Sequence, residues 1–377
     1  MPDPHLLLIW PYGIVGAESI PISMSFLVPQ LAKVIRTTVF DCSLMAAHPA
    51  SDKFRNTVLS YKPTIIGISS WSQNWRWVQR TIAHLRDIDP NLVIIVGGPH
   101  VTATGELGGA DFALMGEAEE SFPKLILALH GQGEVDDVPG VKHAFTPPNP
   151  APTKIMDLDS LGLPNFDAMF LPMYQQGGYR YRTGKTKQAP ILATRGCPYE
   201  CAFCEAPLLS GRKIRKHSIV YLKELIFHLK DKYDVNHVNI VDDNFTFYPK
   251  YAKDFCEMVL SNQDKLSGMT FATPNGIRVE RSDPEMFQMM RRAGWDRVIF
   301  APESGSQRMV DIMAKHLDLN VVPERVEWAH DAGLQVEAFF ILNYPGETDE
   351  DVVETKIDRP RARLRVLDAL PAPTERA

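Results

Sequence analysis

Short apolar runs alternate with amphipathic helical patterns in the first third of the chain. Residues 5–10, 37–42, 64–69, 92–98 and 112–116 are predicted strands, and residues 75–88 and 119–131 are predicted helices. Buried runs rich in Val and Ile, each followed by a Gly- or Ser-containing turn and then a helix, are typical of a parallel sheet covered on both faces. The pattern predicts a doubly wound, flavodoxin-like α/β domain over residues 1–133.

The same alternation returns after residue 190. Strands are predicted at residues 190–196, 237–243, 269–278, 297–305 and 335–346, and helices at 218–233, 250–262 and 283–294. Five strand-and-helix units that run in one direction predict an incomplete (β/α) barrel over residues 190–356, with its active site at the carboxyl ends of the strands. Residues 134–189 are rich in Pro and Gly and lack sustained periodicity, which predicts a linker.

Composition agrees with two domains. A chain of 377 residues, 45% hydrophobic and 23% charged, can bury two cores. Its net charge of -6 disfavours a nucleic-acid backbone as partner. The basic stretch 211–217 is either a solvated loop or an anion contact. No apolar run approaches the roughly 18 residues of a membrane span, and no basic segment precedes the first strand, so we expect a cytoplasmic protein.

Three cysteines in the run ATRGCPYECAFCEAP carry the most specific chemistry. Cys197, Cys201 and Cys204 follow a predicted strand with CxxxCxxC spacing, which can present three thiolates to one face of a cubane cluster and leave the fourth iron open. A zinc site needs four ligands, and His217 is the nearest candidate for the fourth; zinc or inert thiols stay open. Five cysteines are sparse and odd in number, which argues against disulfides, and Cys42 and Cys256 are expected in the core.

Polar and glycine-rich loops follow the predicted strands in both domains, where ligands of parallel α/β sheets bind. Each residue is also a plausible cap or turn residue, and the tryptophans either cover a flat ligand or pack against the next helix. In the first domain the candidates are Gly13, Gly16, Ser69, Trp71, Trp75, Gly97, Gly98, His100, Gly116 and Glu117. In the barrel they are Asp242, Asp243, Arg278, Glu303 and Ser304.

The cysteine loop, with Phe203 before its last cysteine, resembles the signature of the radical S-adenosylmethionine (radical SAM) superfamily. The runs NIVDDNFTF, APESGSQRMVDIMAK and FILNYPGETDED are similar to later strands of the cobalamin-binding branch of that superfamily. The run GGPHVTATGELGGADFALMGEAEESFPKL is similar to its amino-terminal cobalamin domain. These motifs span about residues 5–355, so the resemblance implies a cobalamin domain followed by a radical SAM barrel.

The resemblance also implies roles for the candidate residues. The three cysteines would ligate a 4Fe-4S cluster, and its open iron would bind the amino and carboxylate groups of SAM. The SAM candidates are Asp242, Asp243, Glu303 and Ser304 for the amino group and ribose, and Arg278 for the carboxylate. No DxHxxG motif offers cobalamin a lower axial His, so His100 is interpreted as a loop residue near the corrin edge and Trp71 or Trp75 as a flat group under it.

The implied reaction is a radical methylation. One electron from the cluster cleaves SAM to methionine and a 5′-deoxyadenosyl radical, which abstracts hydrogen from an unactivated carbon that then takes methyl from methylcobalamin. The implied partners are a small-molecule substrate and an electron donor such as flavodoxin or ferredoxin. Two alternatives stay open: a cobalamin-dependent cyclisation, ring contraction or oxidation without methyl transfer, and a non-catalytic protein that binds the cluster or a corrinoid.

The end of the chain departs from the family pattern. A helix and a sixth strand are expected after residue 356, but residues 357–377 are rich in Arg and Pro, show no apolar strand pattern and resemble a frameshifted or spliced ending. We therefore expect a carboxyl-terminally truncated barrel. Its fifth strand would then be an exposed edge.

Overall fold

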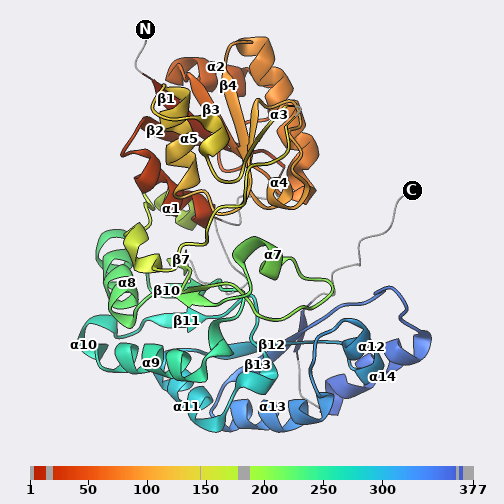
Figure 1. Cartoon of the computed structure of the whole chain (residues 1–377). Helices are drawn as coiled ribbons and strands as arrows, with labels where there is room; N and C mark the ends of the chain where they lie inside the picture. Colours follow the sequence, from red (N-terminus) through yellow and green to blue (C-terminus); the bar gives the residue numbers. More distant parts are fainter. Residues whose placement is uncertain (1–3, 14–19, 145, 177–186, 362–364, 368–377) are drawn as a thin grey trace. The chain divides into compact units, whose positions relative to one another are not determined.

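The structure is a computed structural model that describes residues 4–13, 20–144, 146–176, 187–361 and 365–367. The chain divides into two compact units (Figure 1). The first comprises Met1–Tyr179 with Leu208–Ser210, and the second comprises Arg180–Pro207 with Gly211–Ala377. In the described ranges we find no helix with the length and apolar character that a bilayer crossing requires.

The first unit is built on one six-stranded sheet. Its strands are β1 (His5–Trp10), β2 (Arg36–Asp41), β3 (Ile65–Ser69), β4 (Val93–Gly97), β5 (Phe112–Leu114) and β6 (Val141–His143). Their order is β2-β1-β3-β4-β5-β6, and all neighbours are parallel except β5 and β6. The first five strands have the flavodoxin-like order, so the predicted doubly wound sheet is confirmed.

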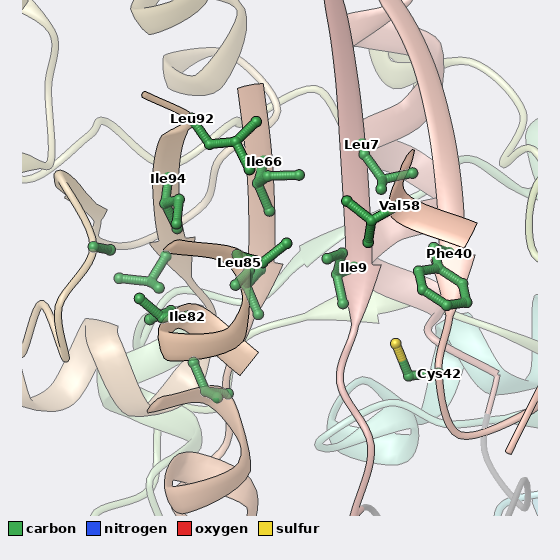
Figure 2. Packing of buried hydrophobic residues seen from close by; sticks show 14 of the residues in the cluster. Leu7, Ile9, Phe40, Cys42, Val58, Ile66, Ile82, Leu85, Leu92 and Ile94 are labelled. Carbon is green, nitrogen blue, oxygen red and sulfur yellow. The ribbon is translucent and has the colours of Figure 1, made fainter. Parts of the chain in front are cut away.

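Helices cover both faces of this sheet because its side chains alternate in direction. The helices are α1 (Ile22–Leu31), α2 (Asp52–Tyr61), α3 (Trp75–Ile88), α4 (Pro99–Thr104) and α5 (Ser121–Leu129). Figure 2 shows Leu7 and Ile9 of β1 packed in one core with Val58 of α2 and Leu85 of α3. On the other face, Gly67 of β3 lies against the ring of Phe122 in α5. Cys42 belongs to the first core, as expected.

The segment predicted as a linker holds regular structure up to residue 176. It contributes β6 to the sheet and includes the helix α6 (Leu171–Gln176). The Gln30 side chain in α1 donates a hydrogen bond to the Leu161 carbonyl (2.8 Å), and the Tyr174 hydroxyl donates to the carboxylate of Asp41 (2.5 Å). Phe166 and Tyr174 are buried. This part of the chain therefore packs onto the first unit.

The second unit is an incomplete barrel of parallel strands. Its strands are β7 (Gln188–Ile191), β8 (Thr194–Arg195), β9 (Arg215–Lys216), β10 (His237–Ile240), β11 (Thr270–Ala272), β12 (Arg297–Glu303), β13 (Gln335–Phe340) and β14 (Arg365–Leu367). Two parallel sheets, β11-β10-β7 and β12-β13-β14, are joined by bridges from Phe271 to Trp295 and from Ile277 to Phe300, while β8 and β9 form a separate antiparallel pair. The predicted partial barrel is confirmed.

Helices follow the strands of the second unit (Figure 1). They are α7 (Ala206–Ser210, of which Leu208–Ser210 are grouped with the first unit), α8 (Ile219–Tyr233), α9 (Pro249–Leu260), α10 (Gln263–Leu266), α11 (Pro284–Ala293), α12 (Gln307–Ile312), α13 (Val322–Asp331) and α14 (Asp349–Arg361). Local sequence sets where several begin: the Ser218 and Asp283 side chains accept hydrogen bonds from backbone N–H groups in the first turns of α8 and α11. Cys256 in α9 is fully buried, as expected for a core residue.

The predicted absence of a sixth strand is wrong. β14 pairs in parallel with β13, from Glu337 with Arg365 to Phe339 with Leu367, so β13 is not the edge of its sheet. In addition, α14 runs past residue 356 to Arg361. Strand pairing uses backbone groups, and a segment of three residues is too short to show apolar periodicity in the sequence.

Candidate functional site

The cysteine loop begins at a glycine that no other residue replaces without strain. Gly196 follows β8 with φ +104°, and a Cβ atom there would lie 2.6 Å from the Lys213 carbonyl oxygen. The next residue is fixed too, because the Cys197 N–H donates to the Gly211 carbonyl (3.0 Å). The loop is therefore anchored against the segment that leads into β9.

Hydrogen-bond donors surround the sulfur atoms of the loop. The Asn244 amide nitrogen lies 3.8 Å from the Cys197 sulfur, and Arg278 Nη1 lies 3.8 Å from the Cys201 sulfur. Burial raises the pKa of the Cys197 and Cys204 thiols, and backbone N–H groups of Tyr199 and Ala206 act in the opposite direction. Such donors stabilise thiolates, which are the form that binds iron.

The cysteine loop offers three thiolates to a metal site. Cys197, Cys201 and Cys204 are free, and each of the other two thiolates raises the pKa of Cys204 by its charge, so the three lie near one another. Within the described ranges, no three His, Cys, Asp or Glu side chains converge as ligands of one ion. A cubane takes one thiolate on each of three irons, and a zinc ion takes all four of its ligands itself. His217, the candidate for a fourth zinc ligand, is buried, and its ring stacks on the Tyr221 ring with centroids 3.9 Å apart.

The two acids after β10 have different surroundings. Asp242 is buried, and its carboxyl oxygens accept hydrogen bonds from the Ala193 N–H (2.7 Å) and the Thr194 hydroxyl (2.8 Å). Burial raises the pKa of Asp242 to about 8. Asp243 is exposed, and its charge raises the pKa of Cys197 and Cys204. Asp242 thus connects two strand ends, while Asp243 lies beside the cysteine loop.

The other predicted SAM residues of the barrel contact groups of the chain itself. Glu303, at the end of β12, has φ +70° and pairs with Lys315 (2.7 Å). Ser304 is fully buried and lies 3.2 Å from the Thr355 hydroxyl. Arg278 pairs with Glu280 and contacts the cysteine loop. The structure therefore brings Arg278 and Asp243 to the cysteines, and gives Asp242, Glu303 and Ser304 partners elsewhere.

In the first unit, the ends of β3 and β4 are held together closely. The Ser70 N–H and hydroxyl both donate to the Gly97 carbonyl (2.8 and 2.7 Å). Gly98 has φ +96°, and a Cβ atom there would lie 2.7 Å from the Ser70 carbonyl oxygen. Ser69 lies in the same place, its hydroxyl 3.1 Å from that Cβ position. These residues form a compact carboxyl edge.

The two tryptophans at this edge differ in exposure. Trp75 is 8% exposed and stacks at a tilt on His100 (4.3 Å). His100 is buried too, and its Nδ1 lies 3.1 Å from the Ser72 hydroxyl. Trp71 is 42% exposed. Trp75 and His100 therefore pack against each other, and Trp71 is the tryptophan that a ligand can reach.

The remaining first-unit candidates have separate contacts. Gly13 has φ +92° and lies against the Trp77 ring, and the Gly116 N–H donates to the Thr102 hydroxyl (3.0 Å). A Glu117 carboxyl oxygen accepts from the Ile155 N–H (3.4 Å). Gly16 lies outside the described residues.

Three further groups lie near these candidate residues. Asn244 directly follows Asp243, so its position after a predicted strand is a local signal in the sequence. Lys315 lies over the Phe203 ring (5.7 Å) and had no local signal. Tyr12, His48 and Trp77 form an aromatic group with ring centroids 5.1 to 5.4 Å apart, which spacing in the sequence does not reveal.

Comparison with protein families identifies both units. Residues 24–126 match the B12 binding domain, and residues 191–356 match the radical SAM superfamily. An uncharacterized methyltransferase of Pyrococcus horikoshii is 26% identical over 354 residues, which are 91% of this chain and 73% of that protein. An anaerobic magnesium-protoporphyrin IX monomethyl ester cyclase of Rubrivivax gelatinosus is 24% identical over 85% of this chain and 58% of its own length.

A solved structure has the same fold. The radical S-adenosylmethionine methyltransferase TsrM from Kitasatospora setae, with tryptophan substrate and a SAM analog bound, superimposes with a TM-score of 0.79 at 14% identity. The match covers 97% of this chain and 73% of that one. With a B12 binding domain and a radical SAM domain in one chain, this protein belongs to the cobalamin-binding radical SAM enzymes, whose cofactors are a 4Fe-4S cluster, S-adenosylmethionine and cobalamin.

Proposed function

We propose that this protein methylates an unactivated carbon of a small molecule by cobalamin-dependent radical SAM chemistry. The observation that carries the proposal is the cysteine loop: three free cysteines in the loop that follows β8, with N–H donors at their sulfur atoms. A B12 binding domain in the same chain supplies a methyl carrier. The Pyrococcus relative is named a methyltransferase, which agrees with this proposal.

Residues of the second unit have three tasks in this proposal. Cys197, Cys201 and Cys204 hold the cluster, which when bound supplies the electron that cleaves SAM. Asp243, exposed beside these cysteines, is our candidate for the SAM amino group, because its carboxylate can accept a hydrogen bond from an amino N–H. The partners of Asp242, Glu303 and Ser304 support a different task, which is to fix the strand ends around the cluster.

Residues of the first unit receive the cobalamin. Gly97 and Gly98 bring backbone close to the ligand at the carboxyl edge of the sheet, where doubly wound folds bind their ligands. Trp71 offers an exposed flat ring at that edge, and we propose that it covers one face of the corrin. Trp75 and His100 support the loop through their mutual packing and the contact of His100 with Ser72.

The proposal includes partners. The substrate is a small molecule, since the net charge of -6 gives no footprint for a nucleic-acid backbone. The electron comes from a low-potential protein such as flavodoxin or ferredoxin, because cleavage of SAM consumes one electron per event. We place the protein in the cytoplasm, where free cysteines stay reduced.

Anaerobic reconstitution with iron, sulfide and cobalamin tests the function. After addition of SAM and a reductant, we expect both 5′-deoxyadenosine and S-adenosylhomocysteine, because a radical methylation consumes one SAM for the radical and one for the methyl group. 5′-Deoxyadenosine alone favours the second candidate, a cyclisation or oxidation, to which the cyclase relative points. If a chain that carries its cluster forms neither product, both candidate functions are contradicted.

Two cysteine variants check the ligands. In Cys201→Ala, the brown absorbance of the cluster and both products are expected to disappear together, since one of three thiolates is lost. Cys256→Ala is the matched control, because Cys256 is buried in α9 and is predicted to leave the absorbance intact. A Cys201→Ala protein with an unchanged cluster would show that the ligand assignment is wrong.

A further inference from the structure

Arg278 lies next to the cysteine loop and is almost fully buried. It follows β11 by six residues and directly precedes a short 3-10 turn at Val279–Arg281. Only 7% of its surface is exposed. A buried guanidinium requires partners for its charge and its N–H groups, so its contacts indicate its role.

Each nitrogen of the Arg278 guanidinium has a partner. Nε pairs with a Glu280 carboxyl oxygen, Nη2 donates to the Lys315 carbonyl, and Nη1 lies 3.8 Å from the Cys201 sulfur. The plane of the group stacks on the Tyr199 ring at 3.5 Å from its centroid. Tyr199 lies between Cys197 and Cys201 in the sequence, so Arg278 contacts the cysteine loop at a ring and at a sulfur atom.

The Lys315 segment contacts the same loop from another element. The Ala202 N–H donates to the Met313 carbonyl (2.9 Å), and the Lys315 ammonium lies over the Phe203 ring (5.7 Å). Glu303 holds that ammonium in a buried ion pair. Arg278 connects both sides, because one planar group donates to the Lys315 carbonyl and to the Cys201 sulfur.

We propose that Arg278 is a positioning residue of the cluster, which fixes Cys201 and raises the reduction potential of the 4Fe-4S centre, and that it does not bind the SAM carboxylate. This inference rests on the proposed cluster at the three cysteines. An N–H donor and a positive charge at a ligating sulfur stabilise the reduced, more negative cluster. Its partners on the protein orient the guanidinium toward sulfur and away from a free ligand.

The test compares midpoint potentials of the reconstituted full-length chain without SAM, measured by EPR-monitored reductive titration. In Arg278→Met the midpoint is expected to shift to a more negative potential, because donor and charge are lost. Arg278→Lys keeps the charge but loses the planar fork, so a smaller shift in the same direction is expected. Arg281→Met is the matched control and is expected to keep the wild-type midpoint potential. In the wild type, Arg281 Nε donates to the Tyr199 hydroxyl (3.0 Å), and the Arg281 guanidinium lies over the Phe247 ring (4.8 Å).

The outcomes separate the alternatives. The proposal is overturned if cluster-loaded Arg278→Met has the midpoint potential of the wild type. If the Met variant does not hold its cluster, the same result in cluster-loaded Arg278→Lys overturns it. A wild-type midpoint combined with at least tenfold weaker SAM binding, measured by equilibrium dialysis, assigns Arg278 to the SAM carboxylate instead. A wild-type chain that gains no cluster absorbance contradicts the proposed function itself, whereas equal potentials in loaded proteins contradict only this inference.

Discussion

Asp242 and Asp243 are neighbours in the sequence with opposite environments. Asp242 is buried between two hydrogen-bond donors near the end of β7, and Asp243 is exposed beside the cysteines. A buried carboxyl group is more stable in its neutral form, which explains why the pKa of Asp242 rises to about 8. Asp242 is therefore a structural acid, and Asp243 is the candidate for contact with a ligand.

This shift predicts how stability depends on pH. Between pH 4 and 8 the folded protein holds a proton on Asp242 that the unfolded chain releases, so the free energy of unfolding falls as pH rises, by at most about 1.4 kcal/mol per pH unit. Asp242→Asn resembles the protonated form and is expected to lack this contribution. Urea unfolding of both apo proteins at several pH values measures it. A difference between them that stays constant from pH 4 to 8 would contradict the prediction.

The tryptophans at the edge of the first sheet give a second matched pair. Trp75→Ala opens a cavity beside His100 and is expected to cost about 3–5 kcal/mol of unfolding free energy. Trp71→Ala is expected to change stability by less than about 0.5 kcal/mol and to weaken cobalamin binding roughly tenfold, or about 1.4 kcal/mol. Urea unfolding and a cobalamin titration by absorbance separate the two effects. Unchanged affinity in Trp71→Ala would remove it from the corrin site.

At the scale of elements, α14 closes the turn that follows β12. The Gly305 N–H donates to the Thr355 hydroxyl (3.0 Å), and the Ser306 hydroxyl donates to the Asp351 carboxylate (2.6 Å). The bonds from Arg308 and Ser306 hold the pKa of Asp351 below its usual range. Because this turn follows Glu303 and begins with Ser304, α14 helps to fix residues near the active end of the barrel.

The contact at Gly305 predicts the effect of one methyl group. A Cβ atom there would lie 2.6 Å from the Thr355 Cα, so Gly305→Ala must displace α14 and is expected to cost about 1–3 kcal/mol. Val353→Ala, at a half-exposed position of the same helix, is the control and is expected to change little. Thermal unfolding of the apo proteins gives the comparison. Equal melting temperatures for Gly305→Ala and wild type would exclude the close contact.

At the scale of the whole molecule, the extent of the first unit has a testable consequence. Residues 1–176 include β6 and α6, and in this segment Phe166 and Tyr174 are buried. Burial of each of these side chains contributes about 2 kcal/mol to the free energy of unfolding. We expect a fragment of residues 1–176 to be several kcal/mol more stable to urea than a fragment of residues 1–133, in which Asp41 loses its Tyr174 partner. Equal stability would place the boundary near residue 133, where composition alone puts it.

Local patterns were enough to predict both folds and to single out the cysteine loop. Strand and helix periods repeat within a few residues, and the three cysteines lie within one loop, so each signal is contained in a short stretch of sequence. The contact between Arg278 and Cys201 joins residues 77 positions apart, and the pairing of β13 with β14 depends on backbone alone. Side-chain burial likewise separates Asp242 from Asp243 and Trp75 from Trp71. Only packing in three dimensions decides such features, because direction and burial depend on neighbours that are distant in the chain.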